Sequence, residues 1–307
     1  MTDRLDILKT YKLFIDGKFP RSESGRSWPV GGAPDAPFAH VSKASRKDLR
    51  EAVEAARKAQ PGWGNATAYL RGQILYRIAE MMEGKRAELV EAIASVGPRS
   101  VKAAKGKKST NAAPRAAKPL DEVAAAIDRV VHYAGWADKY AQVLGCNNPV
   151  AGPYYNFTAP EPVGVVGVFG PEGSPLLGLV SLLMPVVVSG NTAVLVSATD
   201  NPLPAAIFGE VLATSDVPPG VVNVLTGDRT ELIAHAANHR DIDAIHAANL
   251  SGAEATTLRA GAAENLKRVT VRGVPTSLDF FDAAACQDPW WIEAFVEMKT
   301  MWHPAGA

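Results

Sequence analysis

Four glycines recur at every third position near the middle of the chain, where they could let the backbone approach a phosphate group. They are Gly164, Gly167, Gly170 and Gly173. A dinucleotide-binding loop needs the spacing Gly-x-Gly-x-x-Gly at the start of a helix, and that spacing is absent here. Glycines that allow a strand and a helix to pack closely explain the pattern equally well. The glycines alone are therefore weak evidence for a nucleotide site.

Two histidines and two cysteines are the other side chains suited to metal binding or nucleophilic chemistry. His235 and His239 lie four residues apart on a predicted helix, but no third metal ligand accompanies them. Cys146 and Cys286 lack the Cys-x-x-Cys spacing of a zinc or redox site. We interpret the histidines as surface or half-buried residues and both cysteines as unreactive thiols. No metal site is predicted.

A basic segment at residues 98–118 contains seven Lys and Arg residues and no acidic residue. Such an arm can bind nucleic acid or an acidic protein. This one lacks the interleaved aromatic residues that stack on bases, and it has no apolar periodicity. We predict a solvated insertion, with a regulatory or nucleic-acid-binding module as the alternative.

The composition is that of a folded globular protein. The chain has 307 residues, 47% of them hydrophobic and 21% charged, which excludes a chain that is disordered, collagen-like or coiled-coil throughout. The 32 basic and 32 acidic residues balance, so the overall charge indicates no nucleic-acid or membrane partner. The first residues do not have the layout of a signal peptide, and no apolar run is long enough to cross a membrane. We expect a soluble, cytoplasmic protein.

Hydrophobic periodicity divides the chain into a helical first half and an alternating second half. Asp16-Gly17 between short apolar stretches predicts a hairpin, and Ser45 with Asp48 predicts the capped start of a helix that ends at Pro61-Gly62. Apolar residues then repeat at helical spacing, which predicts that residues 45–143 are mainly helical. In the second half, the predicted strands are 163–169, 192–196, 221–225, 243–246 and 268–271, and the helices between them are 176–189, 202–214, 230–238 and 252–260.

Strands and helices that alternate in this way favour an α/β fold with a doubly wound, Rossmann-type parallel sheet. In such a sheet a ligand binds beyond the carboxyl ends of the strands. Near the end of the chain, Val296, Met298 and Trp302 alternate with polar residues, which predicts one more strand.

Three sequence runs, in order and at the expected spacing, resemble the aldehyde dehydrogenase superfamily. They are Glu161-Pro-Val-Gly-Val-Val-Gly-Val-Phe-Gly-Pro171, Gly190-Asn-Thr-Ala-Val-Leu195 and Pro218-Pro-Gly-Val-Val-Asn-Val-Leu-Thr-Gly227. The resemblance starts at Tyr11, extends to about Asp282 and returns at Ile292–Trp302. In the family, the catalytic domain with its cysteine nucleophile lies between these last two parts. The resemblance therefore implies a truncated, degenerate member without that domain.

Other residues occupy the family's functional positions in the part that matches. The oxyanion-hole Asn corresponds to Gly173, and the catalytic Glu corresponds to Arg272. The ribose-binding Lys corresponds to Val196, and the Phe-Thr-Gly-Ser run at the cofactor pyrophosphate aligns with four residues that end at Asn249. The resemblance thus implies no catalytic residue and at best a vestigial cofactor site. The residues expected to border it are Phe169, Gly170, Pro171, Val196, Gly227 and Asn249.

Two segments remain that the family's chemistry does not require, the arm 147–160 and the final strand. In the family they form a flap that pairs with a neighbouring subunit, and exposed aromatic strands would be an aggregation hazard in a monomer. The side chains expected to make this contact are Tyr154, Tyr155, Phe157, Val296, Met298 and Trp302. The pattern is similar to the non-catalytic second lobe of two-lobed bacterial aldehyde dehydrogenases.

The sequence therefore predicts a non-catalytic subunit that associates with a full-length aldehyde dehydrogenase or with itself, without a cofactor, nucleic acid or membrane. One alternative is an NAD(P)-dependent oxidoreductase acting on aldehydes, and another is a vestigial nucleotide-binding protein. Catalysis by Cys286 is a weaker alternative, because Asp288 is near and no histidine is. The expected domains are 1–146 with hairpin, helices and insertion, the arm 147–161, the Rossmann-type core 162–282, and the linker with the final strand 283–307.

Overall fold

The computed structural model of the protein describes residues 7–33, 36–96, 118–273 and 277–306. The predicted insertion at 98–118 lies outside these residues, apart from Lys118. None of the helices within the described ranges is both long enough and apolar enough to cross a membrane.

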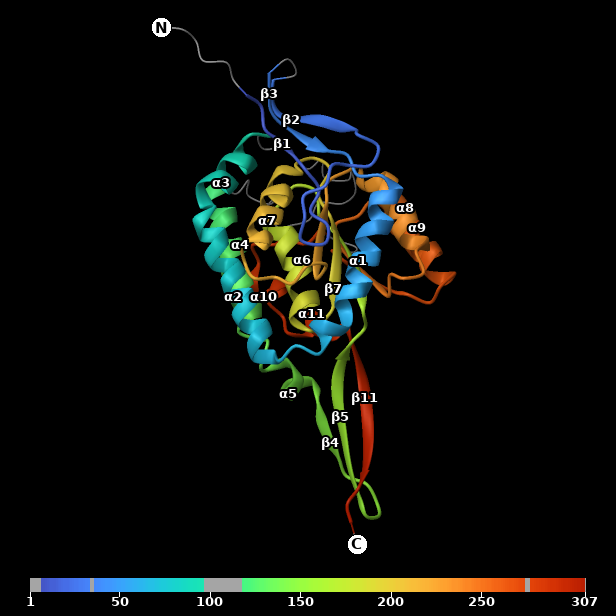
Figure 1. Ribbon diagram of the computed structural model, residues 1–307. Helices are drawn as coiled ribbons and strands as arrows, with labels where there is room; N and C mark the ends of the chain where they lie inside the picture. Colours follow the sequence, from blue (N-terminus) through green and yellow to red (C-terminus); the bar gives the residue numbers. More distant parts are fainter. Residues whose placement is uncertain (1–6, 34–35, 97–117, 274–276, 307) are drawn as a thin grey trace, which may run out of the picture.

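A five-stranded parallel sheet lies at the centre of the molecule (Figure 1). Its strands are β6 (Val165–Phe169), β7 (Thr192–Val196), β8 (Val222–Leu225), β9 (Ala244–Ala248) and β10 (Arg268–Arg272). Their order is β10-β9-β6-β7-β8, and every neighbouring pair is parallel. The chain runs from β6 outward to β8 and then returns to place β9 on the other side of β6. This confirms the predicted doubly wound sheet, and the switch point lies between β6 and β9.

Helices cover both faces of this sheet. On one face lie α6 (Leu177–Val188) and α7 (Leu203–Ala213), and on the other lie α1 (Arg46–Gly64), α8 (Arg229–Asn238) and α9 (Gly252–Ala263). The central strands are buried on both sides, which is why they are continuous apolar runs in the sequence. The predicted strands and helices of this half are confirmed to within about two or three residues at each end.

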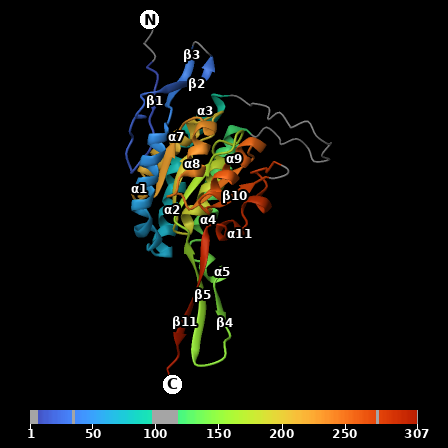
Figure 2. The same cartoon turned by 90° about the vertical axis from the view of Figure 1, so that its right-hand side faces the viewer.

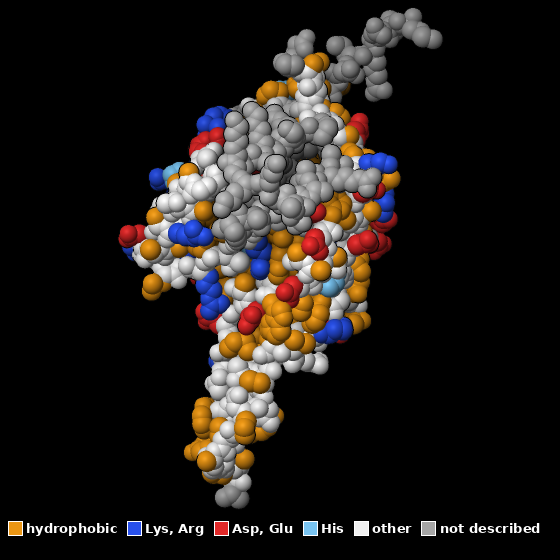
Figure 3. Space-filling view, turned by 180° about the vertical axis from the view of Figure 1, so that it is seen from behind, with side chains coloured by type: hydrophobic (Ala, Val, Ile, Leu, Met, Phe, Trp, Pro, Cys, Tyr) orange, Lys and Arg blue, Asp and Glu red, His pale blue; other side chains and the backbone are white. Residues whose placement is uncertain are grey.

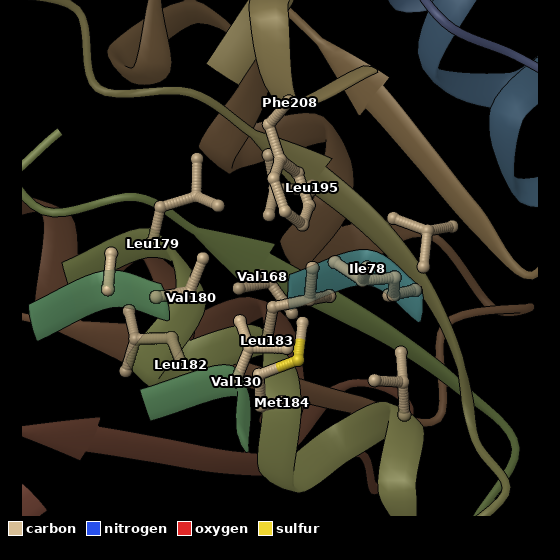
Figure 4. Close-up of a cluster of buried hydrophobic side chains, with 14 of the residues drawn as sticks. Ile78, Val130, Val168, Leu179, Val180, Leu182, Leu183, Met184, Leu195 and Phe208 are labelled. Carbon is tan, nitrogen blue, oxygen red and sulfur yellow. The ribbon is translucent and has the colours of Figure 1, made fainter. Parts of the chain in front are cut away.

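The remaining long helices form an outer layer over α6 and α7. They are α2 (Ala68–Gly84), α3 (Arg86–Ala94) and α4 (Pro119–Ala134), followed by the short α5 (Tyr140–Leu144). Figure 4 shows the resulting core, in which Ile78 of α2 and Val130 of α4 meet Leu183 of α6 and Phe208 of α7 beside the sheet. The predicted helical character of residues 45–143 is thus confirmed where the structure describes it.

The start of α1 follows the prediction, and its end does not. Ser45 Oγ accepts from the Asp48 N–H, and Asp48 in turn accepts from the Ser45 N–H, which forms the expected capping box. The helix continues through Pro61 to Gly64 instead of stopping at Pro61-Gly62. Burial of Trp63, whose Nε1 donates to the Val187 carbonyl at 2.9 Å, favours this last turn.

A small sheet at the top of the molecule was only partly predicted. Its strands are β1 (Thr10–Tyr11), β2 (Ser27–Ala33) and β3 (Ala36–Ser42), in the order β1-β3-β2. The predicted turn at Asp16-Gly17 is present, with φ of 52° and 72°, but it joins only a short ladder, in which Ile15 pairs with Lys18 and the Leu13 N–H donates to the Pro20 carbonyl. The hairpin of β2 and β3 was missed, because a strand that contains proline and two glycines carries little strand signal.

A second small sheet projects from the body as a flap (Figures 1 and 2). It consists of β4 (Cys146–Asn148), β5 (Tyr154–Pro162) and β11 (Val296–Pro304), which pair antiparallel in the order β11-β5-β4. Two single-turn helices, α10 (Ala283–Cys286) and α11 (Trp290–Glu293), lead from the core to β11. The predicted final strand is thereby confirmed.

Candidate functional site

The predicted cofactor residues lie together at the carboxyl edge of the parallel sheet. Phe169 and Val196 end β6 and β7 and are partners across those paired strands. The other four follow the strand ends, with Gly170 and Pro171 after β6, Gly227 after β8 and Asn249 after β9. Doubly wound sheets bind ligands at this edge, so these residues and their neighbours form the candidate site.

Close packing of two loops accounts for Gly170 without any ligand. Its N–H donates to the Val196 carbonyl at 2.8 Å. A Cβ on this glycine would lie 2.9 Å from the Ala198 nitrogen, which is closer than real Cβ atoms approach other atoms. The glycine is therefore required by the contact between the loops that follow β6 and β7.

Two acidic residues join these same loops. The Glu172 carboxylate accepts from the Thr199 and Asp200 N–H groups at 3.1 and 2.8 Å. In return, Asp200 Oδ2 accepts from the Gly173 N–H at 2.9 Å. Burial and the adjacent Glu172 raise the pKa of Asp200 to about 7. Burial alone would raise the pKa of Glu172, but its hydrogen bond with Asp200 and the nearby charge of Arg229 outweigh burial and lower it.

A buried ion pair links the next two elements of the edge. The Arg229 guanidinium, on α8, donates to both carboxylate oxygens of Glu254 on α9, at 2.8 and 3.2 Å. The two side chains are only 7% and 8% exposed. Arg229 also donates to the Gly170 carbonyl at 3.1 Å and lies 3.4 Å from Glu172. One guanidinium thus connects the loop after β6 with both α8 and α9.

A third carboxylate fills the start of α6. Glu122, from α4, accepts from the N–H groups of Leu176 and Leu177 at 3.0 and 3.1 Å. Burial raises the pKa of Glu122, and these two hydrogen bonds oppose that effect. The first N–H groups of a helix lack partners inside the helix, so a carboxylate at this position is favourable.

Carboxylates of the chain itself lie at the helix starts of this edge, where a dinucleotide phosphate would bind. A helix start binds phosphate through its free N–H groups. Here Glu122 accepts from the start of α6, Asp228 from the start of α8, and Glu254 from the Ser251 N–H at the start of α9. Arg229, the cation among them, is already paired with Glu254. A phosphate group would have to displace or approach these carboxylates, which repel it.

This network of side chains is not apparent from the sequence. Glu122, Glu172, Arg229 and Glu254 come from four separate parts of the chain, and no short motif joins them. Ser251 with Glu254 three residues later is a capping box that could have been recognised before α9. This motif predicts a helix start at which the chain's own side chains bond to the first N–H groups.

Arg272, which the sequence resemblance aligns with the family's catalytic Glu, lies at the end of β10 in an aromatic setting. Its Nε donates to His246 Nε2 at 2.8 Å, and its guanidinium carbon lies 3.8 Å from the centre of the Trp291 ring. Burial lowers the pKa of Arg272 to about 10. A guanidinium that remains charged cannot act as the general base that a carboxylate would be.

His246 is held neutral by this contact. The ring is fully buried on β9, and its Nδ1 lies 2.8 Å from the Leu182 carbonyl. Since Nε2 accepts from Arg272, Nδ1 carries the proton and donates to that carbonyl. Burial, and then the charge of Arg272, hold the pKa of His246 well below its usual range.

Acidification is therefore expected to destabilise the fold through His246. An unfolded histidine binds a proton below a pH of about 6.5, whereas the folded one does not. The free energy of unfolding should fall by up to about 1.4 kcal/mol per pH unit below that value. Urea unfolding of the wild type and of His246→Gln between pH 5 and 7 measures this. The raised pKa of Asp200 stabilises the folded state as the pH falls in this range. The quantity compared is therefore the difference in the free energy of unfolding between the wild type and His246→Gln at each pH. Parallel curves would contradict the assignment.

The remaining sequence candidates form no second site. His235 lies on α8, but His239 lies just beyond its end, so the prediction that both histidines lie on one helix is wrong. Cys286 is buried, which raises its thiol pKa, while Cys146 is exposed on the flap. Within the described ranges, no group of three or more His, Cys, Asp or Glu side chains is placed to hold a metal ion.

The flap is the other candidate, as an interaction surface. Successive residues of a strand point to opposite faces, so Tyr155 and its neighbour Phe157 lie on one face, and Trp302 on the other. The rings of Tyr155 and Phe157 lie 5.4 Å apart, and those of Tyr154 and Trp302 lie 5.8 Å apart in an edge-to-face arrangement. Figure 3 shows hydrophobic side chains along the projecting flap. Each face thus has an aromatic cluster near the tip.

The predicted flap residues differ in how exposed they are. Tyr154, Tyr155, Met298 and Trp302 are 46%, 52%, 45% and 59% exposed. Phe157 is half-buried by its neighbours, and Val296 is buried in the core at the root of the flap. The surface available to another chain therefore includes the four exposed residues, Tyr154, Tyr155, Met298 and Trp302, and it excludes Val296.

Comparisons with known proteins identify relatives that match most of this chain. The model of the "Aldehyde dehydrogenase family" matches residues 29–273. Mouse "Retinal dehydrogenase 2" is 34% identical over 288 residues, which cover 92% of this chain and 52% of that protein. "Aldehyde dehydrogenase" of Aspergillus niger is 32% identical over 276 residues, which cover 88% of this chain and 52% of that protein.

Solved structures give the same result. The NAD+ complex of the aldehyde dehydrogenase from Bacillus cereus superposes with a TM-score of 0.74 at 29% sequence identity. That match covers 86% of this chain and 50% of the Bacillus protein. The chain spans about half the length of the relatives that it matches.

Proposed function

The chain belongs to the aldehyde dehydrogenase family, and from that premise we propose that it is a non-catalytic member, which associates through its flap with a catalytic aldehyde dehydrogenase or with a second copy of itself. Its role would be structural or regulatory, for example to seal a channel of the partner.

The observation that carries this proposal is the flap. It is a three-stranded sheet with exposed aromatic side chains on both faces. A sheet normally buries at least one face against another layer, and a small sheet is marginally stable without one. A partner chain that supplies this layer explains why Tyr154, Tyr155 and Trp302 are present at such exposed positions.

The candidate site supports the non-catalytic part of the proposal. Gly173 offers no side-chain donor for an oxyanion, and Arg272 offers no base. The one buried thiol, that of Cys286, has a raised pKa, which is the opposite of what a nucleophilic cysteine needs. Reactions of the family that require a nucleophile and a base would have to take place on a partner.

The site also supports the expectation that no NAD(P) is bound. Val196 cannot donate to a ribose, and the helix starts at this edge already hold the chain's own carboxylates. The alternative, an NAD(P)-dependent oxidoreductase acting on aldehydes or a vestigial nucleotide-binding protein, is favoured by the likeness to the NAD+ complex from Bacillus cereus. Phe169, Gly170 and Gly227 would then border the cofactor.

Calorimetric titration with NAD+ and with NADP+ distinguishes the proposed non-catalytic function from the alternative functions that bind a cofactor. We expect no saturable heat for either cofactor up to about 1 mM, which is the upper end of the usual range for enzyme substrates. A full-length aldehyde dehydrogenase titrated in the same buffer is the positive control. Saturable binding in the micromolar range would favour the alternative function and would contradict the expectation that this site binds no cofactor.

A further inference from the structure

The two loops after β6 and β7 are tied together by an exchange of hydrogen bonds between their acidic side chains. Glu172 accepts from two N–H groups of the β7 loop, and Asp200 accepts from the Gly173 N–H of the β6 loop. Asp200 Oδ1 also accepts from the Asn201 N–H at 2.9 Å. Each loop thus supplies both a carboxyl group and backbone donors to the other.

The two carboxyl groups also lie in contact with each other. Two ionised carboxylates in contact repel each other, which favours a proton on one of them. Glu172 faces the Arg229 guanidinium at 3.4 Å and accepts from two N–H groups, all of which favour its ionised form. Among the described residues no cation is paired with Asp200, so we assign the proton to Asp200.

From this arrangement we infer that the Glu172–Asp200 pair is a pH-sensitive latch, which fastens the two loops when Asp200 is protonated and loosens them when it ionises. Loss of the proton places two negative charges in contact in a half-buried setting, where they repel each other more strongly than in water. The inference does not rest on the proposed function.

The described residues around the pair include no other group that titrates near neutral pH. Arg229, from α8, faces Glu172, and Glu254, from α9, reaches the pair only through Arg229. The residues of β2 and of the end of α3 that border Asp200 carry no charge among those described.

The direction of the effect follows from where the proton is bound. With the latch closed, the pKa of Asp200 is about 7, whereas an aspartate freed from Glu172 has a pKa of about 3.9. Between these values the closed state holds a proton that the open state lacks. The open population should therefore rise with pH by at most about tenfold per unit from pH 5 to 7, and then level off.

Hydrogen exchange monitored by mass spectrometry tests the latch on the full chain. Peptides covering 170–176 and 197–203 are compared at pH 5, 6, 7 and 8 after correction for the intrinsic exchange rate. We expect their protection to fall as pH rises, by at least about tenfold in total, while peptides from β6 stay constant. Protection that is flat or rises with pH would overturn the inference.

Two variants remove the titration of Asp200 near neutral pH in different ways. Asp200→Asn cannot ionise, and Glu172→Gln removes the neighbouring charge, so each should flatten the pH dependence of these loops to less than about threefold. Asp241→Asn, at an exposed carboxylate, is the matched control and should behave as the wild type. If Asp200→Asn fails to fold, Glu172→Gln still decides the matter. A pH dependence that is unchanged in a folded latch variant refutes the latch.

Discussion

Replacing Tyr155 and Trp302 together by serine is expected to weaken association of the chain with its partner at least about 100-fold. These side chains lie on opposite faces of the flap and are 52% and 59% exposed in the single chain. Aromatic residues at the centre of an interface commonly contribute about 2 kcal/mol or more each, and every 1.4 kcal/mol is a factor of ten in the dissociation constant. Because both side chains are exposed, their loss should leave the fold of the chain intact.

Sedimentation velocity over a range of concentrations measures this effect. The matched control replaces a tyrosine and a tryptophan that are also exposed but lie on the body, Tyr69→Ser with Trp290→Ser. The control pair should associate as the wild type does. If the flap variant associates as tightly as the control, the flap is not the interface.

Among the substitutions considered for this protein, those that break the Arg229–Glu254 pair are expected to lower the free energy of unfolding most. Each side chain is less than a tenth exposed, so Arg229→Ala leaves a buried carboxylate and Glu254→Ala leaves a buried guanidinium. Removal of one partner from a buried pair typically costs about 3–5 kcal/mol. In this protein the loss should be increased by the contacts of Arg229 with Gly170 and Glu172, which fasten the same edge of the sheet.

Chemical denaturation monitored by circular dichroism gives the free energy of unfolding of each variant. Arg50→Ala serves as the control, because its pairing with Glu54 on the surface of α1 is exposed at both residues and should contribute no more than about 0.5 kcal/mol. The double variant Arg229→Met with Glu254→Leu should lose less than either single variant, since it leaves no unpaired charge. A loss below about 1 kcal/mol for both single variants would show that the pair does not hold this edge together.

The sequence was sufficient to predict most of the central fold. The strands β6 and β7 are continuous apolar runs because both of their faces are covered, and Ser45 with Asp48 encodes the start of α1 within four residues. Signals of this kind are local, and they survive in a single sequence. The hairpin of β2 and β3 was missed, since its strands contain prolines and glycines and are specified by pairing rather than by propensity.

The candidate site was predictable only in part. The positions of Gly173, Val196 and Arg272 followed from the resemblance, but their new partners did not. His246 meets Arg272 because β9 and β10 are neighbours in a parallel sheet, and Glu172 meets Asp200 because two loops cross at its edge. Such contacts depend on tertiary arrangement and have no local pattern in the chain.

The central claim is that this chain is an aldehyde dehydrogenase relative that acts through association. The most direct test is the mass of the purified chain in solution, measured by sedimentation velocity alone and after mixing with a full-length aldehyde dehydrogenase from the same organism. The account predicts either a dimer of the chain or a complex with the enzyme, and loss of that species in the Tyr155→Ser with Trp302→Ser variant. A chain that stays monomeric in both samples, and that oxidises an aldehyde with NAD+ by itself, would contradict it.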